Sequence, residues 1–157
     1  MNRITYLCLV LSCFVAIELD AQDLAQPSDL IGTWHNQKDQ EDPSQLVITS
    51  YDSTTATISG YFLSPSGTEG GSFPLTGLVN RRSLTAAEQK EEKHQALSVS
   101  FSVFWKDYGS ITSWTGICFE KAGQLQLNTN WMLVRSVTDY EWDHVLTGYD
   151  LFTKREE

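Results

Sequence analysis

The sequence is poor in basic residues, with 11 lysines and arginines against 20 aspartates and glutamates, and its formal net charge at pH 7 is −9. The basic residues form no cluster larger than the Arg81–Arg82 pair. Nucleic acids and anionic membrane surfaces attract clusters of positive charge. Neither is therefore expected as a partner of this protein.

Long hydrophobic runs are also scarce. One nearly uninterrupted apolar stretch, from Ile4 to Ile17, follows the single charge of Arg3. This pattern is typical of a secretory signal peptide, here residues 1–21 with cleavage near Ala21, although a loose match leaves lipid attachment at Cys13 open. The stretch is too short to span a bilayer comfortably, and no later segment resembles a transmembrane helix. We expect a protein secreted to the extracellular medium or periplasm.

Cysteine is rare outside this leader, since only Cys118 follows it. An intrachain disulfide in the mature protein is therefore excluded, although an interchain bridge stays open. A free cysteine is usually buried, so Cys118 is expected on the inside of a strand.

Catalytic and metal-binding motifs are missing. The sequence contains no Gly-x-Ser-x-Gly nucleophile elbow. The three histidines (His35, His94 and His144) do not have metal-ligand spacing, and one mature cysteine cannot complete a zinc site. We therefore expect no enzyme activity, no metal and no cofactor, and we read the histidines as surface residues.

Short segments with period-two alternation of apolar and polar residues are abundant. In 98–105, Val99, Phe101 and Val103 share one face, and Trp105 continues it. Strands are expected at 30–35, 45–51, 55–63, 72–80, 96–106, 111–120, 124–135 and 145–154. Even spacing with antiparallel connections predicts an up-and-down barrel or a sandwich, and an eight-stranded barrel can hold one small ligand. We expect one all-β domain over 30–155, after a polar linker at 22–29.

The expected connections differ in kind. Residues 51–54 and 122–124 read as tight hairpin turns, with Gly123 able to take positive φ. Residues 64–71 read as a flexible loop. The segment 84–95 is rich in helix formers without an apolar stripe, which indicates a solvated loop with one or two helical turns; a lid or partner surface is the alternative.

Tryptophan is concentrated in the second half of the chain. A small barrel would turn four of these indoles toward one cavity, which suggests an aromatic box for a small ligand. They are Trp105, Trp114, Trp131 and Trp142.

Several motifs, taken in order, resemble the avidin and streptavidin family of biotin-binding proteins over about residues 30–155. The matching pieces are Gly32-Thr-Trp-His-Asn-Gln37, Pro74-Leu-Thr-Gly77, Trp105-Lys, Ser110-Ile-Thr-Ser-Trp-Thr-Gly116, Leu127-Asn-Thr-Asn-Trp-Met-Leu133 and Gly148-Tyr-Asp-Leu-Phe-Thr-Lys154. The resemblance implies an eight-stranded antiparallel up-and-down β-barrel that binds biotin and assembles as a tetramer or, less often, a dimer. Trp34 is then a core residue at the base of the barrel.

For the ureido oxygen of biotin, the resemblance implies hydrogen-bond donors at Asn36 and Ser44, with the extra residues of 38–43 accommodated between them. The family's third donor is a tyrosine, and Phe62 stands at its place here. A shift of one residue would bring Tyr61 there, but it would turn every neighbouring side chain to the other face. Loss of this donor at a dry site costs about 1–3 kcal/mol.

Other roles also follow from the resemblance. Asp150 and Ser64 accept hydrogen bonds from the ureido nitrogens, Thr112 contacts the ring sulfur, and Ser110 reaches the valerate carboxylate. Ser66 and Thr68, in the loop after the third strand, close over the valerate end.

The walls of the site come from Trp105, Trp114 and Trp131, with Leu133 beside them. Trp142 crosses a subunit interface to cap the ligand of a neighbouring subunit, which makes a homo-oligomer the expected state.

The sequence leaves two other classes of binding protein open. One is a different secreted carrier, of lipocalin type or a carbohydrate-binding module, although a lipid pocket would not need the polar set described above. The other is an avidin-like barrel that binds biotin weakly, or binds a related ligand, because Phe62 lacks the hydroxyl.

Overall fold

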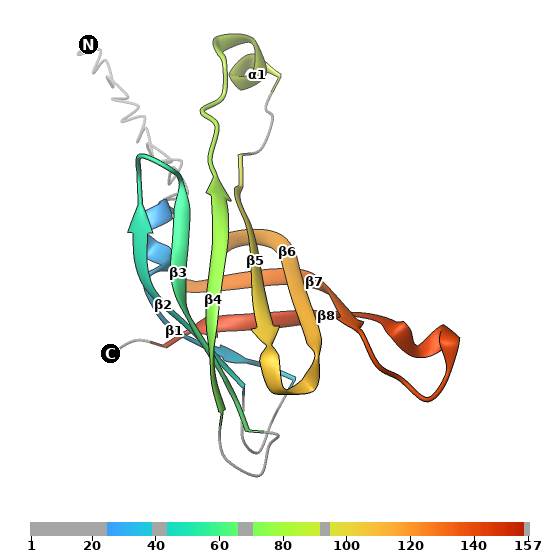
Figure 1. The fold of residues 1–157 in the computed structure, drawn as a ribbon. Coiled ribbons are helices and arrows are strands. Elements are labelled where there is room, and N and C mark those ends of the chain that lie inside the picture. The colour runs from blue at the N-terminus through green and yellow to red at the C-terminus, as the bar shows by residue number, and fades with distance from the viewer. Residues whose placement is uncertain (1–24, 39–43, 66–70, 92–94, 156–157) are drawn as a thin grey trace, which may run out of the picture.

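The computed structural model describes residues 25–38, 44–65, 71–91 and 95–155. Eight strands, each antiparallel to the next, close into a barrel because β8 also pairs with β1 (Figure 1). The strands are β1 (Gly32–Asn36), β2 (Gln45–Asp52), β3 (Thr57–Ser64), β4 (Gly71–Asn80), β5 (Leu97–Trp105), β6 (Ser110–Lys121), β7 (Gln124–Arg135) and β8 (Val145–Lys154). The predicted all-β, eight-stranded up-and-down barrel is confirmed.

The core of the barrel follows the alternation read from the sequence. Val99, Phe101 and Val103 are at most 2% exposed, while the serines between them face outward. The same alternation on the other strands buries large apolar side chains along the axis, and each fully buried one contributes about 1.5–3 kcal/mol to folding. The largest of them are Trp34, Leu46, Ile48, Ile58, Leu75, Leu127 and Phe152.

One irregularity changes the alternation within β2. The pairing between β2 and β3 shifts between Ile48 and Ser50, as in a β-bulge. Leu46 and Ile48 point inward before the bulge, and Tyr51 packs against the core after it. The bulge therefore lets one long strand keep its apolar side chains inside the barrel.

The connections largely follow expectation. Ala122 and Gly123 have φ of 53° and 77° between the paired residues Lys121 and Gln124, which makes the predicted tight hairpin. The β2–β3 turn begins later than predicted, after Asp52, whose carboxylate accepts the backbone N–H of Thr54 at 2.8 Å. Ser64 and Gly71, predicted in a loop, end β3 and begin β4.

The connection between β4 and β5 contains a short helix, α1 (Ala86–Lys90), as predicted for 84–95. Thr85 caps it, and Glu88 forms a 2.7 Å ion pair with Arg82. This hydrogen-bonded pairing lowers the pKa of Glu88 to about 2.

The barrel is closed at one end by the segment that precedes β1. Pro27 starts a single turn of 3-10 helix, η1 (Pro27–Leu30), so Leu30 is not in a strand as predicted. Leu30 is fully buried, Ala25 is 7% exposed, and the indole N–H of Trp34 donates to the carbonyl of Leu30 at 2.8 Å. Residues 25–29 of the predicted linker thus fold against the barrel, and Trp34 occupies its predicted place at the base.

The opposite end of the barrel carries the β1–β2, β3–β4, β5–β6 and β7–β8 connections. The β5–β6 connection contains η2 (Lys106–Tyr108) and the β7–β8 connection contains η3 (Glu141–His144). Figure 1 shows the β7–β8 connection projecting away from the barrel. In the part of the chain that the structure describes, we find no helix with the length and hydrophobicity to cross a membrane.

Candidate functional site

The inward-facing side chains near this second end include most of the residues predicted for the ligand site. They come from six of the eight strands, because the barrel turns every second residue of each strand toward one axis. These residues are Asn36, Phe62, Ser64, Trp105, Ser110, Thr112, Trp114, Trp131, Leu133 and Asp150.

An aromatic cluster forms the centre of the site. The Phe62 ring stacks on Trp114 with a centroid separation of 5.3 Å and meets Trp105 edge-on at 5.6 Å. Phe101 stacks on Trp114 at 5.2 Å from the core side. Phe62 is 5% exposed, whereas Tyr61 lies on the outer face. Phe62, and not Tyr61, therefore occupies the position predicted for it.

Asp150 is a carboxylate held inside the barrel. It is 9% exposed, and one of its oxygens (Oδ2) accepts the indole N–H of Trp114 at 2.9 Å. The hydroxyl of the fully buried Thr129 donates to the backbone carbonyl of Asp150 at 3.3 Å. The second carboxylate oxygen keeps its capacity to accept a hydrogen bond from a ligand N–H.

Thr112 and Trp105 form a second polar contact beside the aromatic cluster. The indole N–H of Trp105 donates to the Thr112 hydroxyl at 2.7 Å. The hydroxyl proton of Thr112 can therefore be donated elsewhere. Ser110, opposite Trp105 in the pairing of β5 and β6, is 7% exposed.

Asn36 and Ser44 lie next to each other despite the residues between them. The backbone N–H of Asn36 donates to the carbonyl of Ser44 at 2.9 Å. The Asn36 side-chain oxygen accepts the backbone N–H of Lys38 at 3.0 Å, which leaves its NH₂ group as a donor. Lys38 is itself fixed, because its ammonium group lies 4.1 Å from the centroid of the Tyr149 ring.

Trp131 lies against Gly148, its partner in the pairing of β7 and β8. A Cβ atom on Gly148 would lie 2.3 Å from Cζ2 of this indole, so only glycine leaves room for the ring. Trp131 in turn pairs with Trp114 on β6, which continues the aromatic wall.

Phe73 is an aromatic neighbour of the site that the sequence analysis does not identify. Its ring centroid lies 4.6 Å from that of Trp105, and Tyr108 of η2 lies 6.5 Å away on the same side. Phe73 alternates with the buried Leu75 and Val79 on β4, and this period-two pattern is the signal that could have found it.

Three predicted residues are not part of this arrangement. Ser66 and Thr68 lie outside the described residues. Trp142, in η3, is 77% exposed and stacks on Tyr140 at 5.4 Å, and among the residues that are described it makes no ring contact with the aromatic cluster of the site.

The remaining nucleophilic and metal-ligating side chains lie elsewhere. Cys118 is 2% exposed, as predicted, and burial raises the pKa of its thiol to about 12. His35, read from the sequence as a surface residue, is half-buried, and its Nε2 atom is enclosed without a hydrogen-bond partner in the described part of the chain. Within those described ranges, no three His, Cys, Asp or Glu side chains group as metal ligands would.

A closed barrel with buried indoles and inward-facing polar groups at one end defines the class of small-ligand-binding β-barrels. Residues 24–155 match the Avidin family, and the chain belongs to that family. It is similar to the crystal structure of bradavidin, with 28% identity over 79% of each chain and a TM-score of 0.60. A comparison with curated protein sequences found no match.

Proposed function

We propose that this protein is a non-catalytic biotin-binding protein that holds its ligand among the tryptophans of the barrel mouth. The observation that carries the proposal is the buried Asp150–Trp114 hydrogen bond, which fixes an ionisable acceptor against an aromatic wall. Biotin is a ligand here and not a cofactor. Family membership supports the same conclusion.

The polar residues fit the two sides of a urea group. Asn36 presents an NH₂ group, and its backbone pairs with the carbonyl of Ser44, so we assign the side chains of both residues to the ureido oxygen. On the other side, Asp150 and Ser64 supply acceptors for the two ureido N–H groups. A buried urea would lose about 1–3 kcal/mol for each polar group left unpaired, so this complementarity matters for affinity.

The apolar and carboxylate parts of biotin fit the remaining residues. Trp105, Trp114 and Trp131, with Leu133, form walls for the thioether ring and the valerate chain, and Thr112 is placed for the ring sulfur. Ser110 is assigned to the valerate carboxylate, and Ser66 and Thr68 to closure over that end.

One observation favours a second candidate, an avidin-like barrel with weakened biotin binding or a related ligand. Phe62 lies within the aromatic cluster and brings no hydroxyl to the ureido oxygen. The lost donor lowers affinity by about 1 kcal/mol or more, which corresponds to several-fold in Kd.

We propose that the functional unit is a homo-oligomer, with a tetramer favoured over a dimer. Phe104, Ile111, Val134 and Val145 are paired in register across four neighbouring strands on the outer face, and each is 46–55% exposed. An apolar row of this kind is typical of an interface, and Trp142 needs a neighbouring subunit to cover its indole. In such an assembly Trp142 completes the biotin site of a neighbouring subunit.

We further propose that residues 1–21 direct secretion and are removed. The family match begins at residue 24, downstream of this leader. Mass spectrometry of the protein recovered from its producing cells tests this step, because cleavage predicts an N-terminus close to residue 22, and an intact Met1 in exported protein contradicts it.

Titration calorimetry of the purified protein with biotin tests the binding proposal. We expect saturation at one biotin per subunit with sub-micromolar affinity. Asp150→Asn keeps an oxygen for Trp114 but presents an NH₂ group to a ligand N–H, so it should lose about 1.5–3 kcal/mol, or about ten- to hundredfold in Kd. The exposed Asp139→Asn makes the same charge change as a control. No heat and no thermal stabilisation at millimolar biotin would refute biotin as the ligand.

A further inference from the structure

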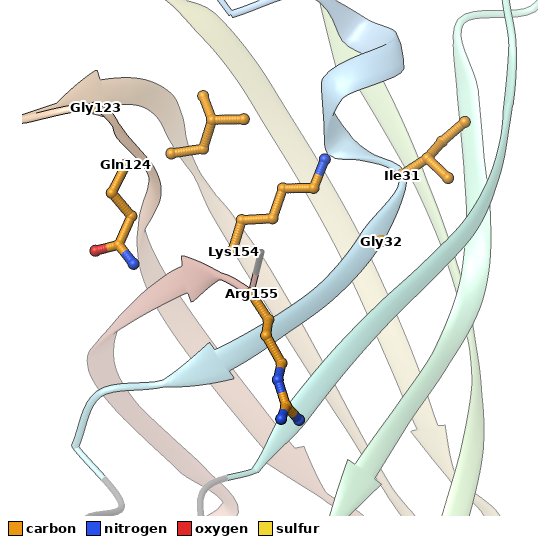
Figure 2. Close-up of a pocket in the computed structure, with 7 residues that line it drawn as sticks. Ile31, Gly32, Gly123, Gln124, Lys154 and Arg155 are labelled. Atoms are coloured by element: carbon orange, nitrogen blue, oxygen red, sulfur yellow. The ribbon is translucent and has the colours of Figure 1, made fainter. Parts of the chain in front are cut away.

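A hollow lies at the closed end of the barrel, at the opposite ends of the strands from the tryptophan site (Figure 2). Its volume is about 460 Å³, and it lies where the start of β1, the β6–β7 turn and the end of β8 meet. Three completely buried side chains fill the barrel between this hollow and the site of Trp105, Trp114 and Trp131: those of Trp34, Leu127 and Phe152. Its lining residues are Ile31, Gly32, Gly123, Gln124, Leu125, Lys154 and Arg155.

Lys154 is the unusual residue of this hollow. On β8 the inward positions are Asp150, Phe152 and then Lys154, so a lysine stands where the alternation would place a core side chain. Figure 2 shows its stem crossing the hollow toward η1. The ammonium group donates to the backbone carbonyl of Asp29 at 2.7 Å.

The neighbouring backbone leaves room for this side chain. Gly32 has φ of +134°, and a Cβ atom there would lie 2.9 Å from Cε of Lys154. Another residue at position 32 would be strained by its φ and would press on the lysine stem. Glycine at position 32, the first residue of β1, therefore allows the Lys154 side chain to cross the hollow.

The hollow combines positive charge with apolar walls. The ammonium of Lys154 has three N–H donors, of which the Asp29 carbonyl takes one. Arg155 and Gln124 lie at the rim, where Figure 2 shows their polar ends directed away from the Lys154 ammonium, and Ile31 and Leu125 supply apolar surface. Among the described residues that line the hollow none is acidic, and the nearby Asp29 carboxylate already accepts the backbone N–H of Gln26 at 2.7 Å.

We propose that this hollow is a second ligand site, for a small organic carboxylate with a short alkyl chain. The carboxylate accepts from the free N–H groups of Lys154, and the alkyl chain lies against Ile31 and Leu125. Charge-assisted hydrogen bonds of this type are the strong ones, and a volume of a few hundred Å³ suits a small ligand. This site does not depend on biotin binding at the other end.

Two probes of similar size separate the charge from the alkyl chain. Hexanoate carries the carboxylate, and hexanamide is its neutral counterpart. Binding is followed through the backbone amide signals of Gly32, Gln124 and Leu125 in ¹H–¹⁵N TROSY spectra. We expect saturable shifts at these amides with hexanoate and much weaker ones with hexanamide.

Lys154→Met removes the charge and keeps an unbranched apolar stem, and it should weaken hexanoate binding by about tenfold or more. Lys121→Met, at an exposed lysine before the same turn, changes the net charge equally and should leave binding unchanged. Arg155→Gln is a second test if Lys154→Met lowers stability, and it should weaken binding several-fold. Equal shifts with hexanamide, unchanged binding in both the Lys154 and Arg155 variants, or shifts confined to Trp114 and Trp131 would overturn the proposal.

Discussion

Replacing Gly148 by alanine tests whether the position of Trp131 is set by the absence of a side chain on the neighbouring strand. A Cβ atom at 148 would lie 2.3 Å from Cζ2, 2.5 Å from Cε2 and 2.9 Å from Nε1 of the indole, whereas ordinary contacts begin at 3.4 Å. The ring must therefore withdraw by about an ångström in a tightly packed environment. Because Trp131 is a wall of the proposed site, this movement should reach the ligand.

The expected magnitude comes from two opposing effects. Overpacking costs about 1–3 kcal/mol, and replacing glycine by alanine at an ordinary φ in a strand recovers about 0.5–1 kcal/mol through the unfolded state. The free energy of unfolding should therefore fall by about 1–2 kcal/mol. Affinity for biotin should fall by a similar amount, or about five- to thirtyfold in Kd.

Calorimetric titration gives the affinity, denaturant unfolding gives the stability, and near-ultraviolet circular dichroism reports the indole environment. Thr147→Ala, at an exposed outward position next to Gly148, is the matched control and should change none of the three. A Gly148→Ala protein with wild-type affinity and an unaltered tryptophan spectrum would refute the reasoning.

Three further predictions concern single residues. Phe62→Tyr should tighten biotin binding by about tenfold, because it restores a donor for the ureido oxygen. Tyr61→Phe is the control and should have no effect. Equal calorimetric affinities of wild type and Phe62→Tyr would count against Phe62 facing the ureido oxygen. The Cys118 thiol, with its pKa raised to about 12 by burial, should resist iodoacetamide at pH 8 until the protein unfolds, as mass spectrometry would show. Because the pKa of Cys118 is higher in the folded than in the unfolded protein, the thiol contributes its full stability below about pH 8.5 and loses it as pH rises toward 12. Over that range, the denaturant midpoint of a Cys118→Ser variant should therefore fall less than that of the wild type. Trp142→Ala should speed biotin dissociation, and an unchanged rate by competition with labelled biotin would remove Trp142 from the site.

The fold was largely predictable because period-two alternation is strong on most strands. The seven-residue run from Val99 to Trp105 shows it without interruption, and the Ala122–Gly123 turn has the required residue types. Less predictable was η1, where Pro27 and the burial of Leu30 replace the expected strand start. The bulge at Thr49 also escapes sequence reasoning, because it depends on pairing with β3.

The resemblance, more than the sequence pattern, indicated which residues share the candidate site. Alternation alone places Trp105 and Trp114 inward, but the hydrogen bonds from Trp105 to Thr112 and from Trp114 to Asp150 join residues on paired or distant strands. The hollow lined by Lys154 could not be predicted from the sequence, because an inward-facing lysine at the end of a strand cannot be told from a surface lysine by its sequence alone. Closure of the barrel is what turns that residue into a lining group.

The most direct test of the central claim is a crystal structure of the protein with biotin. We predict the ureido ring against Trp114 and Phe62, one ureido nitrogen within hydrogen-bond distance of Asp150, and the ureido oxygen facing Asn36 and Ser44. A barrel mouth without biotin in crystals grown at millimolar ligand, or biotin bound with its ureido group away from Asp150, would contradict the account.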